Sequence, residues 1–142
     1  MIQMFRAVLT TALVISAVSV HAQSAEKPVN CAKVDKNGGS QGEMNICQDR
    51  KFVAADAELN KEYAALRGHF RTNGDTEAEA LLVKAQRAWV AWRDAEGELC
   101  AQSRGFSQNG SGYGMVAQSC RTELTRERSG MLKEHRREAE SH

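Results

Sequence analysis

The sequence lacks an excess of charge of either sign, a second long apolar run and any strand-like alternation of apolar and polar residues. Its 142 residues include 19 Lys and Arg and 18 Asp and Glu, for a net charge of +1. Nonspecific nucleic-acid binding needs a clear cationic excess on one face, so this balance argues against it. After residue 22 no apolar run is long enough to cross a bilayer, and the missing alternation argues against a β-sheet.

Motifs for catalysis or for a bound metal are also missing. Ser111 lies outside any Gly-x-Ser-x-Gly frame, and the glycines around it do not follow a strand as a nucleotide-binding loop requires. Asp94 and Glu98 are four residues apart, which is typical of a solvated helix face rather than of a catalytic acid pair. There is no Cys-x-x-Cys pair, and the histidines lack ligand spacing. We therefore expect no enzyme, no cofactor and no metal.

The N-terminus has the pattern of a secretory signal peptide. A positive Arg6 precedes an apolar run over residues 7–20, and small or branched residues lead to Ala22. A transmembrane anchor is the alternative, but the run is shorter than the roughly 20 apolar residues that a spanning helix needs. The pattern predicts cleavage after Ala22. Residues 23–142 would then form a single, nearly neutral domain that is periplasmic or secreted, without stable membrane insertion.

Four cysteines lie in the predicted exported part: Cys31, Cys47, Cys100 and Cys120. An even number in a small exported domain is typical of disulfides, and four cysteines allow three connectivities. Residues 23–42 are rich in loop-forming residues. Cys31 and Cys47 flank the loop at the end of this segment, so we predict that they pair. We predict Cys100–Cys120 because two helical stripes place these side chains at the same level. Cys31 follows Pro28-Val29-Asn30 rather than a lipobox, which argues against a lipid anchor.

The rest of the chain predicts an all-α fold of three long helices, over about residues 41–70, 76–102 and 113–138. The first begins at a capping box, because Ser40 precedes Glu43 by three residues. Its apolar stripe is centred on Leu59 and includes Phe52, Ala55, Tyr63, Leu66 and Phe70. Short connections make neighbouring helices antiparallel. The expected arrangement is therefore up-down-up, after a disulfide-stapled N-terminal loop.

Both tryptophans lie on the second predicted helix, three residues apart. With Trp89 at the centre of a helical wheel, the apolar stripe contains Leu82, Ala85, Trp92, Leu99 and Cys100. Because the chain has only two Trp, two Tyr and four Phe, we expect this stripe to be buried and to form the core. The stripe predicted for the third helix is Tyr113, Val116, Cys120, Leu124, Met131 and His135.

Three separated motifs occur in order along these helices. They are Ala55-Asp56-x-Glu58-Leu59-Asn60-x-x-Tyr63, then Ala85-Gln86-Arg87-Ala88-Trp89-x-x-x-Arg93-Asp94 followed by Cys100, and Cys120-x-x-x-Leu124-Thr125-x-x-Arg128-x-x-x-Leu132. Together they resemble the LprI-type lysozyme-inhibitor family over roughly residues 31–132. The resemblance implies an exported, all-helical bacterial protein without catalysis of its own. It also implies a protein partner, with a c-type lysozyme as the candidate.

We assign the polar and aromatic motif positions to the scaffold rather than to a binding surface. They are Asp56, Asn60, Tyr63, Gln86, Trp89, Arg93, Asp94 and Arg128. Charges beside an apolar stripe need partners. The predicted helix register places Arg128 level with Trp92 and Arg93. We therefore expect Arg128 to stack on an indole and to pair with an acid on a neighbouring helix.

The segment Ser103–Tyr113 is the predicted binding element. It has no helical periodicity, and it offers Arg104, Ser107, Ser111 and Tyr113. A lysozyme cleft presents two carboxylates, which basic or hydroxyl side chains on a rigid loop could occupy. The alternative function is a cell-envelope assembly module, without lysozyme activity, that binds another protein through its helical surface.

Overall fold

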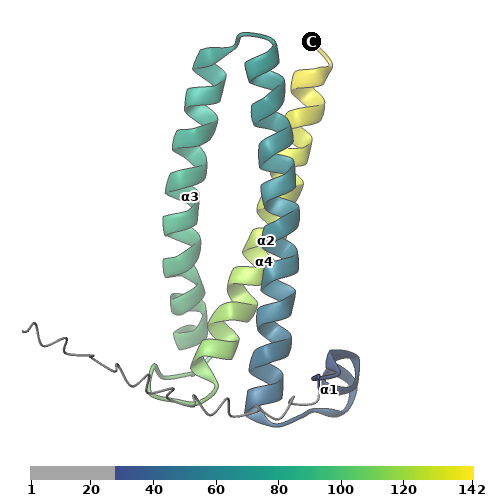
Figure 1. Ribbon diagram of the computed structural model, residues 1–142. Coiled ribbons are helices and arrows are strands. Elements are labelled where there is room, and N and C mark those ends of the chain that lie inside the picture. Colours follow the sequence, from purple (N-terminus) through teal and green to yellow (C-terminus); the bar gives the residue numbers. More distant parts are fainter. Residues whose placement is uncertain (1–27) are drawn as a thin grey trace, which may run out of the picture.

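The computed structural model describes residues 28–142, so the predicted signal peptide lies outside the described residues. Its elements, in chain order, are α1 (Cys31–Asn37), α2 (Gln41–Thr72), α3 (Thr76–Ser103) and α4 (Tyr113–Glu140). Figure 1 shows α2, α3 and α4 running up, down and up, with the loop before α4 and the C-terminus at opposite ends. This part of the chain has no strand. The predicted all-α, up-down-up arrangement is confirmed.

The N-terminal segment contains a helix that the sequence interpretation assigned to loop. α1 begins after Asn30, whose side chain accepts a hydrogen bond from the Lys33 amide at 3.1 Å. It ends at Gly38, whose φ of 76° is a conformation that favours glycine. Asn30 is an ordinary N-cap residue. A helix of two turns has too little apolar periodicity to be recognised from sequence, since only Val34 is buried.

The first long helix begins at the predicted capping box, and the second also begins at a side-chain cap. Ser40 and Glu43 form the capping box: the Ser40 hydroxyl accepts from the Glu43 amide, and the Glu43 carboxylate accepts from the Ser40 amide at 2.9 Å. The bond from the Ser40 backbone, and then that from its hydroxyl, lower the pKa of Glu43. Asp75 caps α3 by accepting from the Ala78 amide at 3.0 Å. Local chemistry therefore fixes where α2 and α3 start.

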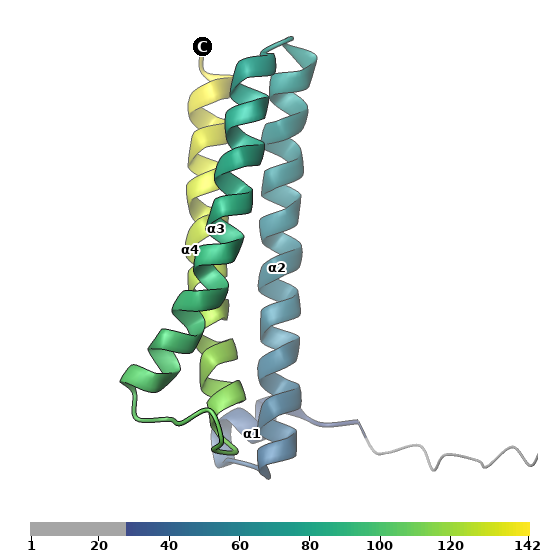
Figure 2. The same ribbon diagram turned by 90° about the vertical axis from the view of Figure 1, so that its left-hand side faces the viewer.

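α4 is the helix on which the other two pack. It makes its most extensive contact with α2 and a smaller one with α3, whereas α2 and α3 touch each other little. In Figure 2, α3 lies at an angle to the other helices, and its C-terminal end runs away from α2. The bundle is therefore an α2–α4 pair with α3 added along one side of α4.

The core between these helices is small and largely aliphatic. Its main cluster consists of Leu59, Leu66, Leu82 and Leu132, with Tyr63, Phe70, Trp89 and Ala139 packed around it. The stripe predicted for α2 supplies half of this cluster. The buried face of α2 also includes a charged residue that the predicted stripe does not contain. Glu62 is 4% exposed, and its carboxylate lies 3.2 Å from Nε of Arg136 on α4. A buried carboxylate is tolerated there because a cation reaches it.

α4 buries two stripes rather than the single one that was predicted. One stripe reaches α3 and consists of Ala117, Cys120, Arg121, Leu124 and Arg128; the other reaches α2 and consists of Thr122, Thr125, Ser129, Leu132 and Arg136. Placing Met131 in the stripe was wrong, because it is 52% exposed, and His135 is exposed as well. The hydroxyls of Thr122 and Thr125 donate to main-chain carbonyls one turn earlier. These small, internally satisfied side chains need no apolar signature.

The predicted burial of the α3 stripe is wrong for half of its members. Trp92 is 49% exposed and Leu99 56% exposed, and Ala85 is exposed too. Leu82 of the predicted stripe is buried, and the other buried positions of α3 are Arg93, Gly97 and Ala101. An arginine and a glycine replace the expected large apolar residues because α3 packs on α4 through a polar cluster and a close backbone approach, both described below.

Both predicted disulfides are present. Cys31–Cys47 ties α1 to α2, and Cys100–Cys120 ties the end of α3 to α4 at a Cα–Cα distance of 6.4 Å. Neither α1 nor the three long helices are apolar enough over a sufficient length to cross a membrane. Two disulfides in so small a domain are typical of an extracytoplasmic protein.

Candidate functional site

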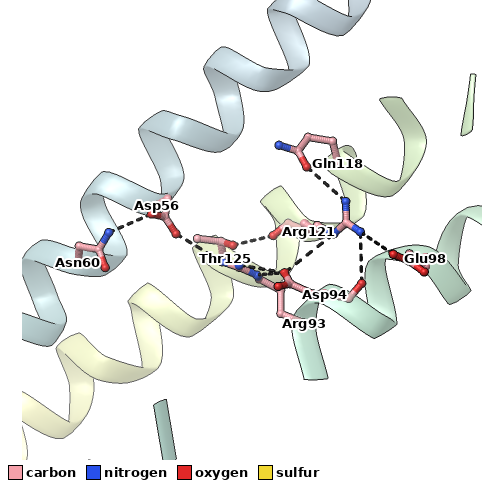
Figure 3. Close-up of polar contacts among 8 residues, drawn as sticks. All are labelled: Asp56, Asn60, Arg93, Asp94, Glu98, Gln118, Arg121 and Thr125. Atoms are coloured by element: carbon pink, nitrogen blue, oxygen red, sulfur yellow. Dashed lines mark hydrogen bonds and ion pairs between the residues drawn. The ribbon is translucent and has the colours of Figure 1, made fainter. Parts of the chain in front are cut away.

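Arg93 is the centre of a polar cluster between the long helices (Figure 3). Its side chain is only 9% exposed, and its terminal nitrogens lie 3.3 Å from an Asp56 carboxylate oxygen and 2.9 Å from one of Asp94. The rings of Phe52 and Trp89 have their centroids 5.2 Å from the guanidinium carbon. Two carboxylates and two aromatic faces offset the cost of burying this charge. Arg93 therefore joins α3 to α2.

Arg121 extends this cluster onto α4, as Figure 3 shows. It lies 3.3 Å from a Glu98 carboxylate oxygen and donates to the main-chain oxygen of Asp94 at 3.4 Å. Gly97 makes room for it, since a Cβ there would lie 2.5 Å from Cγ of Arg121 and 3.1 Å from the Ala117 carbonyl oxygen. The sequence interpretation missed these contacts. Asp94 and Glu98 are half exposed, as expected for a solvated face. Their four-residue spacing on α3 also lets both face one cation, Arg121, which follows Cys120 in the sequence.

Arg128 behaves only partly as the sequence predicted. Its guanidinium carbon lies 5.9 Å from the ring centroid of Trp89, which is the expected stacking on an indole. The expected acid on a neighbouring helix is not there: Nε donates instead to the amide oxygen of Gln86 at 3.2 Å. Burial lowers the pKa of Arg128. Within residues 28–142, no carboxylate lies within ion-pair distance of this cation.

The remaining motif positions complete the scaffold. Asn60 donates to the Asp56 carboxylate at 2.9 Å, which orients this carboxylate toward Arg93. Tyr63 and Trp89 are half-buried around the main apolar cluster. In the described residues, no group of His, Cys, Asp and Glu is placed to hold a metal ion. The geometry of these motif residues supports a role in positioning the helices.

The loop between α3 and α4, residues 104–112, carries most of the predicted binding positions. Ser107 and Ser111 are exposed, and Arg104 is half exposed, with its guanidinium 3.7 Å from a Glu123 carboxylate oxygen. Tyr113 is different, because its ring packs on the apolar cluster at the base of the loop. Its hydroxyl is buried and has no hydrogen-bond partner in the described part of the chain. Tyr113 therefore supports the loop from below, while the other three residues face solvent.

Comparisons with known proteins found a family and a similar protein. A family model described as "Lysozyme inhibitor LprI" matches residues 31–132, from the first cysteine to the core residue Leu132. A protein of Rhizobium meliloti (strain 1021), described as uncharacterized, is 42% identical over 112 residues, covering 72% of this chain and 78% of its own length. No solved structure matches the chain. The match spans both disulfides, the Arg93 cluster and the loop before α4, and the chain belongs to the LprI lysozyme inhibitor family.

Proposed function

We propose that the protein is an exported, non-catalytic inhibitor of a c-type lysozyme, active in the periplasm or outside the cell. Membership of an inhibitor family supports this proposal, and one structural observation carries it. Every residue from Gln102 to Ser111 is exposed, while both ends of this segment are held by a disulfide and by buried residues. The result is a projecting element on a rigid base.

The loop is ordered by its own contacts before any partner arrives. The Phe106 amide donates to the Ala101 carbonyl at 3.0 Å, and the Gly110 amide donates to the Ser107 carbonyl at 2.8 Å. The Phe106 ring lies so close to Gly112 that a Cβ there would be 2.9 Å from it. A loop held in one conformation loses less entropy on binding, which strengthens its affinity for a cleft.

The side chains of the loop suit an acidic cleft. Ser107 and Ser111 offer hydroxyl donors, and Arg104 offers a cation that can hydrogen-bond a carboxylate. The contact of Arg104 with Glu123, at 3.7 Å between half-exposed side chains, is weak. Arg104 can therefore exchange this partner for one of the two carboxylates of a muramidase cleft at little cost.

The decisive experiment is a lysozyme turbidity assay with the purified protein and two matched pairs of variants. Arg104→Ala is compared with Arg126→Ala, which removes the same charge from an exposed position of α4. Ser111→Asp is compared with Ser141→Asp, which adds the same charge at the other end of the bundle. We expect the loop variants to weaken inhibition at least tenfold and their controls to leave it unchanged. Equal effects on inhibition within each pair would show that the loop is not the inhibitory element.

A second candidate function, an assembly module of the cell envelope, draws on a different surface. Trp92 and Leu99 of α3 are large apolar side chains that are about half exposed, and aromatic residues such as Trp92 are enriched in protein interfaces. If the wild-type protein fails to inhibit lysozyme at large molar excess, this second function is favoured. Trp92→Ser would then be expected to abolish capture of the envelope partner without unfolding the bundle.

A further inference from the structure

An apolar groove lies between the three long helices at the end of the bundle opposite the α3–α4 loop. Its volume is about 530 Å³, and its apolar walls include Leu66, Phe70, Leu81, Leu82, Ala85 and Ala139. Small-molecule sites in proteins span roughly 300–1,000 Å³ and have mostly apolar walls with few polar groups. Leu81 is 59% exposed although it forms part of these walls. The groove therefore presents unburied apolar surface of the size of a small ligand.

Arg128 lies at one end of this groove and places a positive charge there. Its Nε is bound to Gln86 and its face is stacked on Trp89, but its two terminal nitrogens have no hydrogen-bond partner in residues 28–142. The other guanidinium groups packed between the long helices differ, because Arg93, Arg121 and Arg136 each contact carboxylates. A partly desolvated cation with free donors is complementary to an anion.

The other charged groups of the groove do not supply this anion. Glu138 is the only acid that lines it, and its carboxylate lies 3.5 Å from Nδ1 of His135. Glu138 is also ten residues from Arg128 along α4, a separation of about 15 Å. This exceeds the screening length of about 8 Å at physiological ionic strength, so Glu138 neither neutralises Arg128 nor repels an anion bound there.

We propose that this groove binds a long-chain carboxylate, with the carboxylate on the terminal nitrogens of Arg128 and the hydrocarbon chain along the apolar walls toward Ala139. From Arg128 to Ala139 the groove follows α4 for about 16 Å, which an extended single chain can cover. A partner helix is about 10 Å across with its side chains and would need considerably more room than this groove offers. Arg128 at one end and the mostly apolar walls between it and Ala139, with His135, Glu138 and His142 toward the opposite end, match an amphiphile better than a peptide.

The test is isothermal titration of the full chain with dodecanoate below its micelle concentration, with dodecanol and octanoate as comparison ligands. We expect one site per chain and an affinity for dodecanoate at least tenfold above that for dodecanol, because the alcohol lacks the charge that Arg128 recognises. Octanoate should bind more weakly than dodecanoate, since each buried methylene strengthens binding by up to about fourfold. No binding of dodecanoate, or equal binding of the acid and the alcohol, would overturn the proposal.

Two variants locate the site. Ala85→Glu places a carboxylate on an exposed wall residue, and Ala54→Glu makes the same change at an exposed position of α2 outside the groove. We expect the first to weaken dodecanoate binding at least tenfold and the second to leave it unchanged. Arg128→Gln should abolish the preference for the acid over the alcohol. Since Ala85 is exposed, its variant tests the site even if Arg128→Gln is unstable. Unaltered binding by Ala85→Glu would place the ligand elsewhere.

Discussion

The α2–α4 interface and the α3–α4 interface hold two helices to the same central helix by different means. Between α2 and α4, α4 contributes Thr122, Thr125, Ser129 and Leu132, which are small or aliphatic and are almost completely buried. Between α3 and α4, a smaller apolar cluster around Ala101 and Ala117 is supplemented by Arg121, Gly97 and a disulfide, and Trp92 and Leu99 of α3 remain half exposed. The α2–α4 interface depends mainly on packing along its length, whereas the α3–α4 interface combines a smaller packed cluster with a disulfide and ion pairs.

The difference between the two interfaces explains why half of the apolar stripe predicted to be buried on α3 is exposed. A helix held by packing must point its apolar residues inward, since its stability comes from the area that it removes from water. A helix held by a disulfide, an ion-pair cluster and a glycine contact is fixed at a few points. Its remaining apolar residues are free to face solvent or a partner.

The largest expected effect tests the packed interface. Leu132→Ala removes a side chain that is 0% exposed from the main cluster, and we expect a loss of about 2–5 kcal/mol in the free energy of unfolding. Leu99→Ala makes the same change at a position that is 56% exposed and should cost within about 0.5 kcal/mol. Urea unfolding followed by circular dichroism measures both. Similar losses for the two variants would show that the interfaces do not differ as described.

Removing the Cys100–Cys120 disulfide should have the next largest effect. Replacing both cysteines by serine opens a loop closed over a sequence separation of 20 residues, and we expect a cost of about 3 kcal/mol. Hydrogen exchange should rise in the C-terminal half of α3 and in the loop, while α2 stays protected. The Cys31→Ser, Cys47→Ser variant is the control, because its disulfide ties α1 and not α3. Uniform loss of protection in the Cys100 and Cys120 variant would contradict this division.

Arg93→Ala tests whether the polar cluster holds α3. Breaking a fully buried pair costs about 3–5 kcal/mol. Asp56 and Asp94 are 38% and 51% exposed, so water compensates part of the loss and we expect about 1–3 kcal/mol. Thermal denaturation of Arg93→Ala beside Arg87→Ala, an exposed arginine of the same helix, measures the difference. Arg128→Ala should cost less than Arg93→Ala, since it leaves no acid without its partner. The reverse order would reassign the anchoring role to Arg128.

The smallest effects come from two glycines in helices, and they should differ in sign. Gly97→Ala places a Cβ against Arg121 and the Ala117 carbonyl, and we expect a net loss of about 1–2 kcal/mol of stability. Gly130→Ala, in the middle of α4, meets nothing within 4 Å and should stabilise the protein by about 0.5–1 kcal/mol. Melting temperatures of the two variants decide the matter. Stabilisation by both would mean that α3 does not approach α4 closely at Gly97.

The sequence by itself determined the three long helices, the capping box of α2 and both disulfides, but not α1. Ser40 with Glu43 and Asp75 with Ala78 act over three residues, so the chemistry that starts α2 and α3 is local and readable in one dimension. The stripe of α2 was equally clear, because α2 buries one face centred on Leu59. The cysteine pairs followed from loop and helix register. The motifs that resemble the LprI family also pointed to Arg93 and Asp56, although not to their contact.

Only the tertiary structure decided which faces of α3 and α4 are buried. α4 lies between two helices and therefore buries two stripes, one of them made of Thr122, Thr125 and Ser129, which no hydrophobic pattern marks. Arg93 can be buried because the carboxylate of Asp56, 37 residues away in the sequence, pairs with it. Arg128 instead donates a hydrogen bond to Gln86 and pairs with no acid in the described residues. Such pairings depend on the relative rotation of whole helices. Periodicity within a single helix cannot specify that rotation, because it is set by what the neighbouring helices present.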